Sequence, residues 1–177
     1  MTPGLALDDA TVFADRATYE SIVREHGAAI ARLVRGYERD AGRAEDLAQE
    51  ALVAIWRALP TFAGRSSLKT WVLAIAHNVA VSHVVRARRD VISRWTSLED
   101  VDVAAAGCAS PEGRIDLQKT LELVRALKPL DRQTMLLWLE GLTTEEIAEA
   151  TGLSTTNVGV KVFRVKALLA QKMEREQ

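Results

Sequence analysis

Residues 142–169 read LTTEEIAEATGLSTTNVGVKVFRVKALL, and they carry the signals of two short helices separated by a tight turn. Thr143 followed by Glu146 is a capping box, which predicts that a helix begins here. Gly152 permits the positive φ of a tight turn, and Ser154 can cap a second helix. That helix repeats apolar side chains at near-helical spacing: Val158, Val162, Val165 and then Leu168 or Leu169. The pattern predicts a helix-turn-helix.

The exposed start of the second predicted helix carries side chains that can read DNA. Asn157 can pair with adenine, and Thr155 and Thr156 can touch a thymine methyl group or a phosphate. Basic side chains further along could reach the DNA backbone: Lys161, Arg164 and Lys166. The alternative is an ordinary helical hairpin whose charges are solvated. This stretch therefore favours DNA binding without proving it.

The charges of the 177 residues are unevenly distributed, although the net charge is only −1. Residues 61–96 carry six basic and one acidic side chain, and residues 151–177 carry five and two. The rest of the chain is acidic. Two basic segments suit nucleic-acid binding, whereas the low total predicts weak nonspecific binding by the free protein.

The remaining pattern is helical, without strand-like alternation, and predicts an all-α fold of two small domains joined by a flexible linker. After an irregular start at 1–14, apolar residues recur with helical spacing from Thr18, with His26 as a core histidine. The further helices are expected at 44–59, 68–89, 117–127 and from Pro129 to near Gly141. The expected domains are 1–92 and 116–177, and the linker is 93–115.

Three features of the first domain could form a binding surface. Asp46, Gln49 and Glu50 lie three and four residues apart, so they share one exposed helix face. A compact loop, TFAGRSS at 61–67, follows Pro60, and the next helix ends in the basic run RARR at 86–89. Each has a plain alternative, because the acidic face could be solvated, Phe62 could be a core anchor, and the arginines could offset the helix dipole.

Residues 44–89 resemble conserved region 2 of the extracytoplasmic-function sigma factors, the smallest group of the sigma-70 family. Residues 139–169, LEGLTTEEIAEATGLSTTNVGVKVFRVKALL, resemble their region 4. The resemblance implies that the first domain binds core polymerase and recognises and melts the minus-ten element, and that the second recognises the minus-thirty-five element. It also implies a non-enzymatic role in transcription initiation.

The resemblance assigns roles to particular residues. Asp46, Gln49 and Glu50 would dock on the β′ clamp helices of bacterial core RNA polymerase, whose β flap is a further partner. The minus-ten DNA would be bound by Phe62, Gly64, Arg65, Ser66, Ser67, Lys69, Asn78, His83, Arg86, Arg88 and Arg89. The minus-thirty-five element would be read by Thr155, Thr156, Asn157, Val160, Lys161 and Arg164. Gly159 departs from many members, which have a basic residue there.

Other functions are less well supported by the sequence. A stand-alone helix-turn-helix regulator explains residues 142–169, but it does not explain why the acidic face, the loop and the basic helix end occur together. We find no phosphate-binding glycine loop, metal-ligand spacing or nucleophile–base pair, so we expect no catalysis, metal or cofactor. With no signal peptide and no apolar run long enough for a bilayer, the expected location is cytoplasmic, without membrane insertion. The simplest interpretation of Cys108 is an incidental thiol, and the alternative is a redox sensor. Many family members are held by an anti-sigma factor, but no residue here identifies one.

Overall fold

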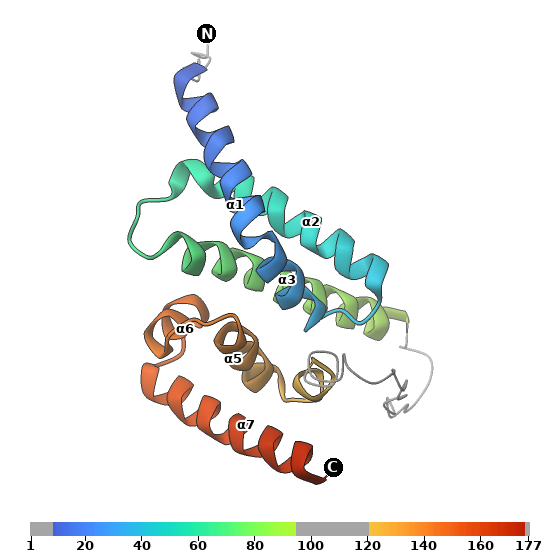
Figure 1. Cartoon of the computed structure of the whole chain (residues 1–177). Coiled ribbons are helices and arrows are strands. Elements are labelled where there is room, and N and C mark those ends of the chain that lie inside the picture. Colours follow the sequence, from blue (N-terminus) through green and yellow to red (C-terminus); the bar gives the residue numbers. More distant parts are fainter. Residues whose placement is uncertain (1–8, 95–120, 176–177) are drawn as a thin grey trace.

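The computed structural model describes residues 9–94 and 121–175, and within these ranges it contains helices and no strand (Figure 1). The N-terminal helices are α1 (Asp9–Arg35), α2 (Ala41–Ala58), the 3-10 turn η1 (Leu59–Thr61) and α3 (Leu68–Arg94). Residues 121–125 are also helical. The C-terminal helices are α5 (Pro129–Leu139), α6 (Thr144–Thr151) and α7 (Thr155–Arg175). The all-α prediction is confirmed, while most of the predicted linker, residues 95–115, lies outside the described residues.

Helix boundaries differ from the predictions where a cap or the absence of a breaker decides them. The irregular start predicted for 1–14 is wrong from Asp9 onward, because α1 begins there. No glycine or proline interrupts the chain between Gly4 and Gly27, and acidic residues suit a helix N-terminus. The second helix begins three residues earlier than predicted, because the side chain of Asp40 accepts a hydrogen bond from the Arg43 amide at 2.9 Å.

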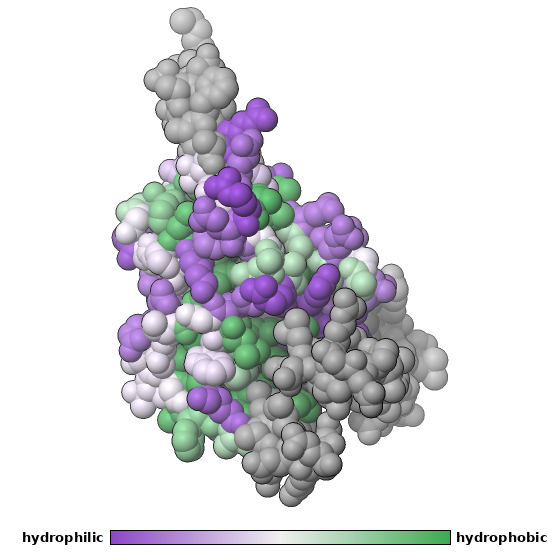
Figure 2. Space-filling view, in the orientation of Figure 1, coloured by the Kyte–Doolittle hydropathy of each residue, from purple (hydrophilic) through white to green (hydrophobic). Residues whose placement is uncertain are grey.

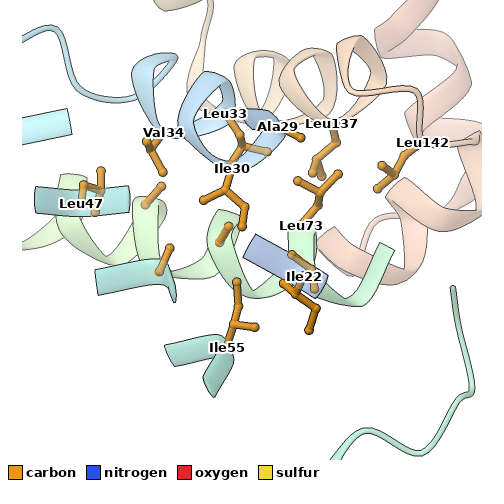
Figure 3. Packing of buried hydrophobic residues seen from close by; sticks show 14 of the residues in the cluster. Ile22, Ala29, Ile30, Leu33, Val34, Leu47, Ile55, Leu73, Leu137 and Leu142 are labelled. Atoms are coloured by element: carbon orange, nitrogen blue, oxygen red, sulfur yellow. The ribbon is translucent and has the colours of Figure 1, made fainter. Parts of the chain in front are cut away.

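The three N-terminal helices share one buried core. Helices α2 and α3 pack against each other, and α1 crosses both (Figure 1). Figure 3 shows Ile22, Ile30 and Leu33 of α1 pointing toward Leu47 and Ile55 of α2 and Leu73 of α3. Each of these side chains is at most 1% exposed. Burying such a side chain contributes about 1.5–3 kcal/mol, so this core accounts for the stable packing of the N-terminal helices.

The prediction that no apolar run is long enough for a bilayer is wrong for α3. Its segment Leu68–Ala87, with a mean hydropathy of 1.2, is long and apolar enough to cross a membrane by length and composition alone. In this fold the same segment packs against α1 and α2, and it buries Val72, Leu73 and Ala76 completely. Packing in the core accounts for part of the hydropathy of α3, since 33% of the segment is buried.

One polar pair lies inside this core. The hydroxyl group of Tyr37 and Nδ1 of His77 are 2.9 Å apart, and His77 is 1% exposed. Burial lowers the pKa of His77 from 6.5 to about 4, and it raises that of Tyr37. The imidazole is therefore neutral at pH 7, and the tautomer decides which of the two groups donates in its hydrogen bond with the tyrosine hydroxyl.

Stability is expected to fall by about 3 kcal/mol between pH 7 and pH 4 because of His77. The unfolded state takes up a proton near pH 6.5, whereas the folded state does so only near pH 4. Since the unfolded state binds more protons in this window, the free energy of unfolding rises with pH there, by about 1.4 kcal/mol per pKa unit of difference. Urea titrations at several pH values would measure the slope. His77→Gln should flatten it, and an unchanged slope would contradict the assignment.

Candidate nucleic-acid and protein interfaces

Helices α6 and α7 form the predicted helix-turn-helix. Thr143 Oγ1 accepts from the Glu146 amide at 3.2 Å, and the Glu146 carboxylate accepts from the Thr143 amide at 2.8 Å, which confirms the capping box. Gly152 has φ 72°, a conformation that other residues rarely adopt. Ser154 accepts from the Asn157 amide at 3.3 Å and caps α7. Because Val158 and Val165 are buried, the opposite side of α7 faces outward.

The exposed side of α7 carries polar and apolar groups. Thr155, Thr156 and Asn157 are all exposed at its N-terminal end, as a DNA-reading helix requires. Val160 is 60% exposed, one turn further along. Phe163 is 79% exposed, and we did not predict it as a site residue. Phe163 lies five residues after Val158, outside the buried stripe, and this spacing could have predicted that its side chain is exposed.

Lys161 and Arg164 are held by a carboxylate that the sequence interpretation missed. Asp131 of α5 accepts from Lys161 Nζ at 2.9 Å and from Arg164 at 2.5 Å. The Asp131 side chain is 8% exposed and that of Lys161 is 14% exposed, whereas that of Arg164 is 54% exposed. Burial alone would raise the pKa of Asp131, but the hydrogen bonds and charges of its two partners outweigh burial and lower it. Lys161 therefore fastens α7 to α5, and Arg164 is the more accessible cation.

A groove of about 990 Å³ runs between α2 and α3. The α2 side of this α2–α3 groove presents Asp46, Gln49 and Glu50, which are all exposed, followed by Val53 at 46% exposure. The α3 side presents Asn78, Ser82 and Arg86. One ion pair joins the two sides at 3.5 Å, between Glu50 and Arg86. Both side chains are more than half exposed, so the pair adds little stability and is available to a partner.

The loop at 62–67 presents a small exposed tip on a fixed base. The ring of Phe62 lies 5.0 Å from that of Trp71 at an interplanar angle of 50°, so Phe62 anchors the loop to α3. Ser67 caps α3 by accepting from the Thr70 amide at 3.1 Å. Between these two ends, Ala63, Gly64 and Arg65 are exposed and Ser66 is half-buried.

The predicted minus-ten residues on α3 lie on different sides of the helix. At 3.6 residues per turn, Lys69 and Asn78 point in opposite directions, and Asn78 and Arg86 face the α2–α3 groove. Lys69 and His83 face the other way. His83 Nε2 is 3.2 Å from a Glu38 carboxylate oxygen. These residues therefore do not form one site, although they follow one helix. Arg88 and Arg89 belong to α3, but their side chains lie outside the described ones.

Within residues 9–94 and 121–175, no group of three His, Cys, Asp or Glu side chains is placed to hold a metal ion. The exposed groups gather instead into three separate surfaces: the α2–α3 groove, the tip of the loop and the outward side of α7. Their side chains are suited to hydrogen bonding, ion pairing and apolar contact with large partners.

Comparison with known proteins identifies both halves of the chain. The model for sigma-70 region 2 matches residues 22–90, and the model for sigma-70 region 4 matches residues 117–169. The RNA polymerase sigma-H factor of Pseudomonas aeruginosa is 30% identical over 90% of this chain and 88% of its own length. The ECF RNA polymerase sigma factor SigC of Mycobacterium tuberculosis is 33% identical over 76% of this chain and 72% of its own.

A solved structure has the same fold. The sigma factor RpoE of Bartonella quintana, in complex with the anti-sigma factor NepR, matches with a TM-score of 0.72 and 21% identity. The match covers 90% of this chain and 99% of that one. With two sigma-70 regions in order and full-length relatives of the same kind, this chain belongs to the extracytoplasmic-function sigma factors of the sigma-70 family.

Proposed function

We propose that this chain directs core RNA polymerase to specific promoters and helps to open the minus-ten region. The observation that carries the proposal is the presence in one chain of a helix-turn-helix with an exposed reading end and a helical domain with a projecting loop and a groove that presents Asp46 and Glu50. A regulator that binds DNA by itself needs the first of these features but not the second.

Core polymerase would bind at the α2–α3 groove. Asp46, Gln49 and Glu50 offer two carboxylates and an amide, which suit arginine side chains on the β′ clamp helices. Val53, at 46% exposure, adds an apolar contact beside them. The Glu50–Arg86 pair would open, so that Glu50 is free for the polymerase and Arg86 for a DNA phosphate. Binding of core polymerase at this groove would place α3 beside the DNA that is melted.

The loop tip would take up a flipped minus-ten base. Unstacking a base costs a few kcal/mol, and a shaped pocket on the open strand can offset this cost. Phe62 would hold the loop in place through Trp71, while Gly64, Arg65 and Ser66 contact the nucleotide. Ser67 has a structural role as the cap of α3, and Lys69 and His83 would follow the strand along one side of that helix.

The outward side of α7 would read the minus-thirty-five element. Asn157 can pair with an adenine edge, and the methyl-bearing Thr155 and Thr156 can contact thymine methyl groups. Val160 offers a further apolar contact. Arg164 would reach a phosphate, whereas Lys161 contributes mainly through Asp131, which keeps α7 in position. Gly159 leaves a gap among the basic residues, so base contacts should contribute more to affinity than phosphate contacts.

A reconstituted transcription assay tests the function. The protein would be mixed with bacterial core RNA polymerase and a library of promoter fragments, and the transcripts sequenced. Specific initiation that depends on this protein is the expected result, and it would reveal both promoter elements. Folded protein that binds duplex DNA alone, but neither binds core nor starts transcripts, would instead favour the stand-alone regulator.

Replacing the loop tip should impair promoter opening more than core binding. Residues 63–66 would become a Gly/Ser segment, while Phe62 and Ser67 stay, because they anchor the loop and cap α3. We expect open complexes to form at least about tenfold more slowly, since the tip no longer offsets part of the unstacking cost. Permanganate footprinting would measure the rate.

A template with a pre-melted minus-ten region supplies the control for the loop variant. Unpairing is already complete on this template, so the defect should shrink there. Equal opening rates for the variant and the wild type on duplex promoter would remove the loop tip from the mechanism.

The same function implies a place and partners. We propose a cytoplasmic location, where polymerase and promoters are found, and no catalysis by this chain, because bond formation belongs to the polymerase. The RpoE relative was solved with the anti-sigma factor NepR, which supports an anti-sigma factor as a partner here as well. Fractionation of cells would test the location, and recovery of co-purifying proteins would test the anti-sigma partner.

A further inference from the structure

Helix α5 holds the cations of α7 whose side chains the structure describes. Within residues 155–168, α7 carries Lys161, Arg164 and Lys166 and no acidic side chain. Lys161 and Arg164 share the carboxylate of Asp131, and Lys166 Nζ lies 4.9 Å from the centroid of the Trp138 ring. Asp131 and Trp138 both belong to α5. The sequence interpretation gave these cations to the DNA backbone, whereas each of them has a partner within the chain.

Asp131 lies beside the side of α7 that would read DNA. Asn157, Lys161 and Arg164 are four and three residues apart, so they share one side of the helix. A recognition helix meets base edges near its N-terminal end and phosphates with the basic side chains beyond it. The Asp131 carboxylate therefore places an anion of the protein against the two cations that would otherwise meet the DNA backbone.

The two cations differ in how far Asp131 encloses them. The Lys161 side chain is 14% exposed, whereas that of Arg164 is 54% exposed. A guanidinium group carries several N–H donors in a planar fork, so Arg164 can turn toward a second anion. Carboxylates and phosphates both bind arginine through charge-assisted hydrogen bonds. Asp131 and a DNA phosphate therefore compete for the same group on Arg164.

The carboxylate also lowers the positive charge of this surface. Burial opposes ionisation of Asp131, but Lys161 and Arg164 outweigh burial and lower its pKa, so it is negatively charged at pH 7. On the face shown in Figure 2, hydrophobic and hydrophilic residues are mixed over the lower part of the molecule, where α5 and α7 lie, and they form no single hydrophilic band there. A sequence-independent attraction of this surface to DNA should therefore be weak.

Competition by Asp131 should weaken the two kinds of DNA complex unequally. Phosphate contacts supply essentially all of the affinity for DNA of random sequence. There, a phosphate that binds Arg164 only replaces one charge-assisted hydrogen bond with another, so little is gained. At the correct element, base contacts from Asn157 fix α7 on the duplex and hold one phosphate next to Arg164 at a high effective concentration. The exchange is therefore favoured where the bases match.

We infer that Asp131 is a specificity-determining residue, an internal competitor of DNA phosphate for Arg164 that suppresses binding to duplexes without the minus-thirty-five element. The inference rests on the proposed function, which identifies α7 as the reading helix. Asp131 itself touches no DNA and acts through Arg164. All the groups involved lie on α5 and α7.

A pair of variants that differ only at Asp131 tests the inference. The first is Lys161→Met, and the second combines it with Asp131→Asn, so that no variant leaves the Lys161 ammonium without its counter-charge. Each full-length variant would be bound to core RNA polymerase. Its affinity would be measured for a promoter fragment from the transcription assay, with the minus-thirty-five element intact or scrambled.

Removal of Asp131 should tighten binding to the scrambled fragment at least about threefold at about 50 mM salt, since Arg164 gains a phosphate contact there. The slope of log affinity against log salt should steepen by about 0.9, the value for one phosphate. Affinity for the intact fragment should change less, so the ratio between the two fragments should fall. Unchanged affinities, or an equal loss on both fragments, would overturn the inference, because a purely structural role of Asp131 predicts such a loss.

Two further variants separate competition from a general change in charge. Glu149 of α6 is exposed, and among the described residues it is not a partner of Lys161 or Arg164. In the Lys161→Met background, Glu149→Gln removes one negative charge, as Asp131→Asn does, and should leave the ratio between the fragments nearly unchanged. Adding Arg164→Gln to the double variant should abolish its gain on the scrambled fragment. An equal effect of Glu149→Gln, or a gain that persists without Arg164, would overturn the inference.

Failure of the proposed function would be recognised separately. If the wild-type chain does not bind core, or starts no transcripts with it, the proposed function fails. The full-length variants without core, titrated with duplex DNA of random sequence, then judge the role of Asp131. A steeper salt slope for the double variant than for Lys161→Met retains the competition, and equal slopes remove it.

Discussion

Core-polymerase binding should fall at least about 100-fold when Asp46 and Glu50 are both replaced by lysine. Both carboxylates are exposed on one side of α2 and line the α2–α3 groove. Each reversal puts a positive charge against the basic partner that we propose, and juxtaposed like charges cost several kcal/mol. At 1.4 kcal/mol per factor of ten, a loss of about 3 kcal/mol gives the expected change. Fluorescence anisotropy with labelled protein and titrated core would measure it.

The chain contains a matched control for this charge reversal. Glu145 and Glu149 of α6 are also exposed and also four residues apart, but they lie outside the groove. Replacing both by lysine changes the net charge by the same amount. The fold should survive in either variant, because the Glu50–Arg86 ion pair that the groove would lose is more than half exposed on both sides. If the two double variants weaken core binding equally, the groove is not the docking surface.

Asp131→Asn should destabilise the C-terminal domain by about 2–4 kcal/mol. The substitution keeps the size of the side chain but leaves Lys161, at 14% side-chain exposure, without its counter-charge. Breaking a buried ion pair from one side commonly costs 3–5 kcal/mol, and partial exposure reduces this figure. Thermal and urea unfolding would report the loss. Arg164→Gln should cost less, because the Arg164 side chain is 54% exposed.

A double-mutant cycle separates the ion pair from its surroundings. Lys161→Met removes the buried cation and keeps an unbranched side chain of similar length. Combined with Asp131→Asn it should cost clearly less than the sum of the two single changes, because neither charge is then left unpaired. Strict additivity would show that Asp131 and Lys161 act independently, and that the position of α7 depends on apolar packing alone.

Local signals in the sequence predicted most of the fold. The capping box at Thr143 and Glu146, the turn at Gly152 and the cap at Ser154 are each encoded within four residues, and the structure confirms all three. The start of α1 was missed because neither the absence of helix breakers nor the acidic residues near Asp9 fix where a helix begins. Periodicity alone could not tell that the apolar α3 is a core helix, since packing partners decide that.

The candidate site was predictable as a set of surfaces but less so in detail. Sequence spacing was enough to place Asp46, Gln49 and Glu50 on one face, because helix geometry fixes their relation. It could not show that Asn78 and Arg86 share a groove with them, because that depends on how α2 and α3 pack. Asp131 lies 30 residues before Lys161, and no local pattern connects the two. The close approach of the Leu136 side chain to Gly36 is similarly long-range.

Helix α3 has a consequence for how this protein can change over time. Its 27 residues form a rod about 40 Å long, with the loop at one end and the groove residues Asn78, Ser82 and Arg86 further along. Inserting one residue between Lys69 and Asn78 would rotate one end by about 100° relative to the other. The loop itself can gain or lose residues at its exposed tip. Insertions and deletions among descendants of this chain should therefore accumulate at 63–66. They should be rare in α3, because its length and rotation fix the position of the loop relative to the groove.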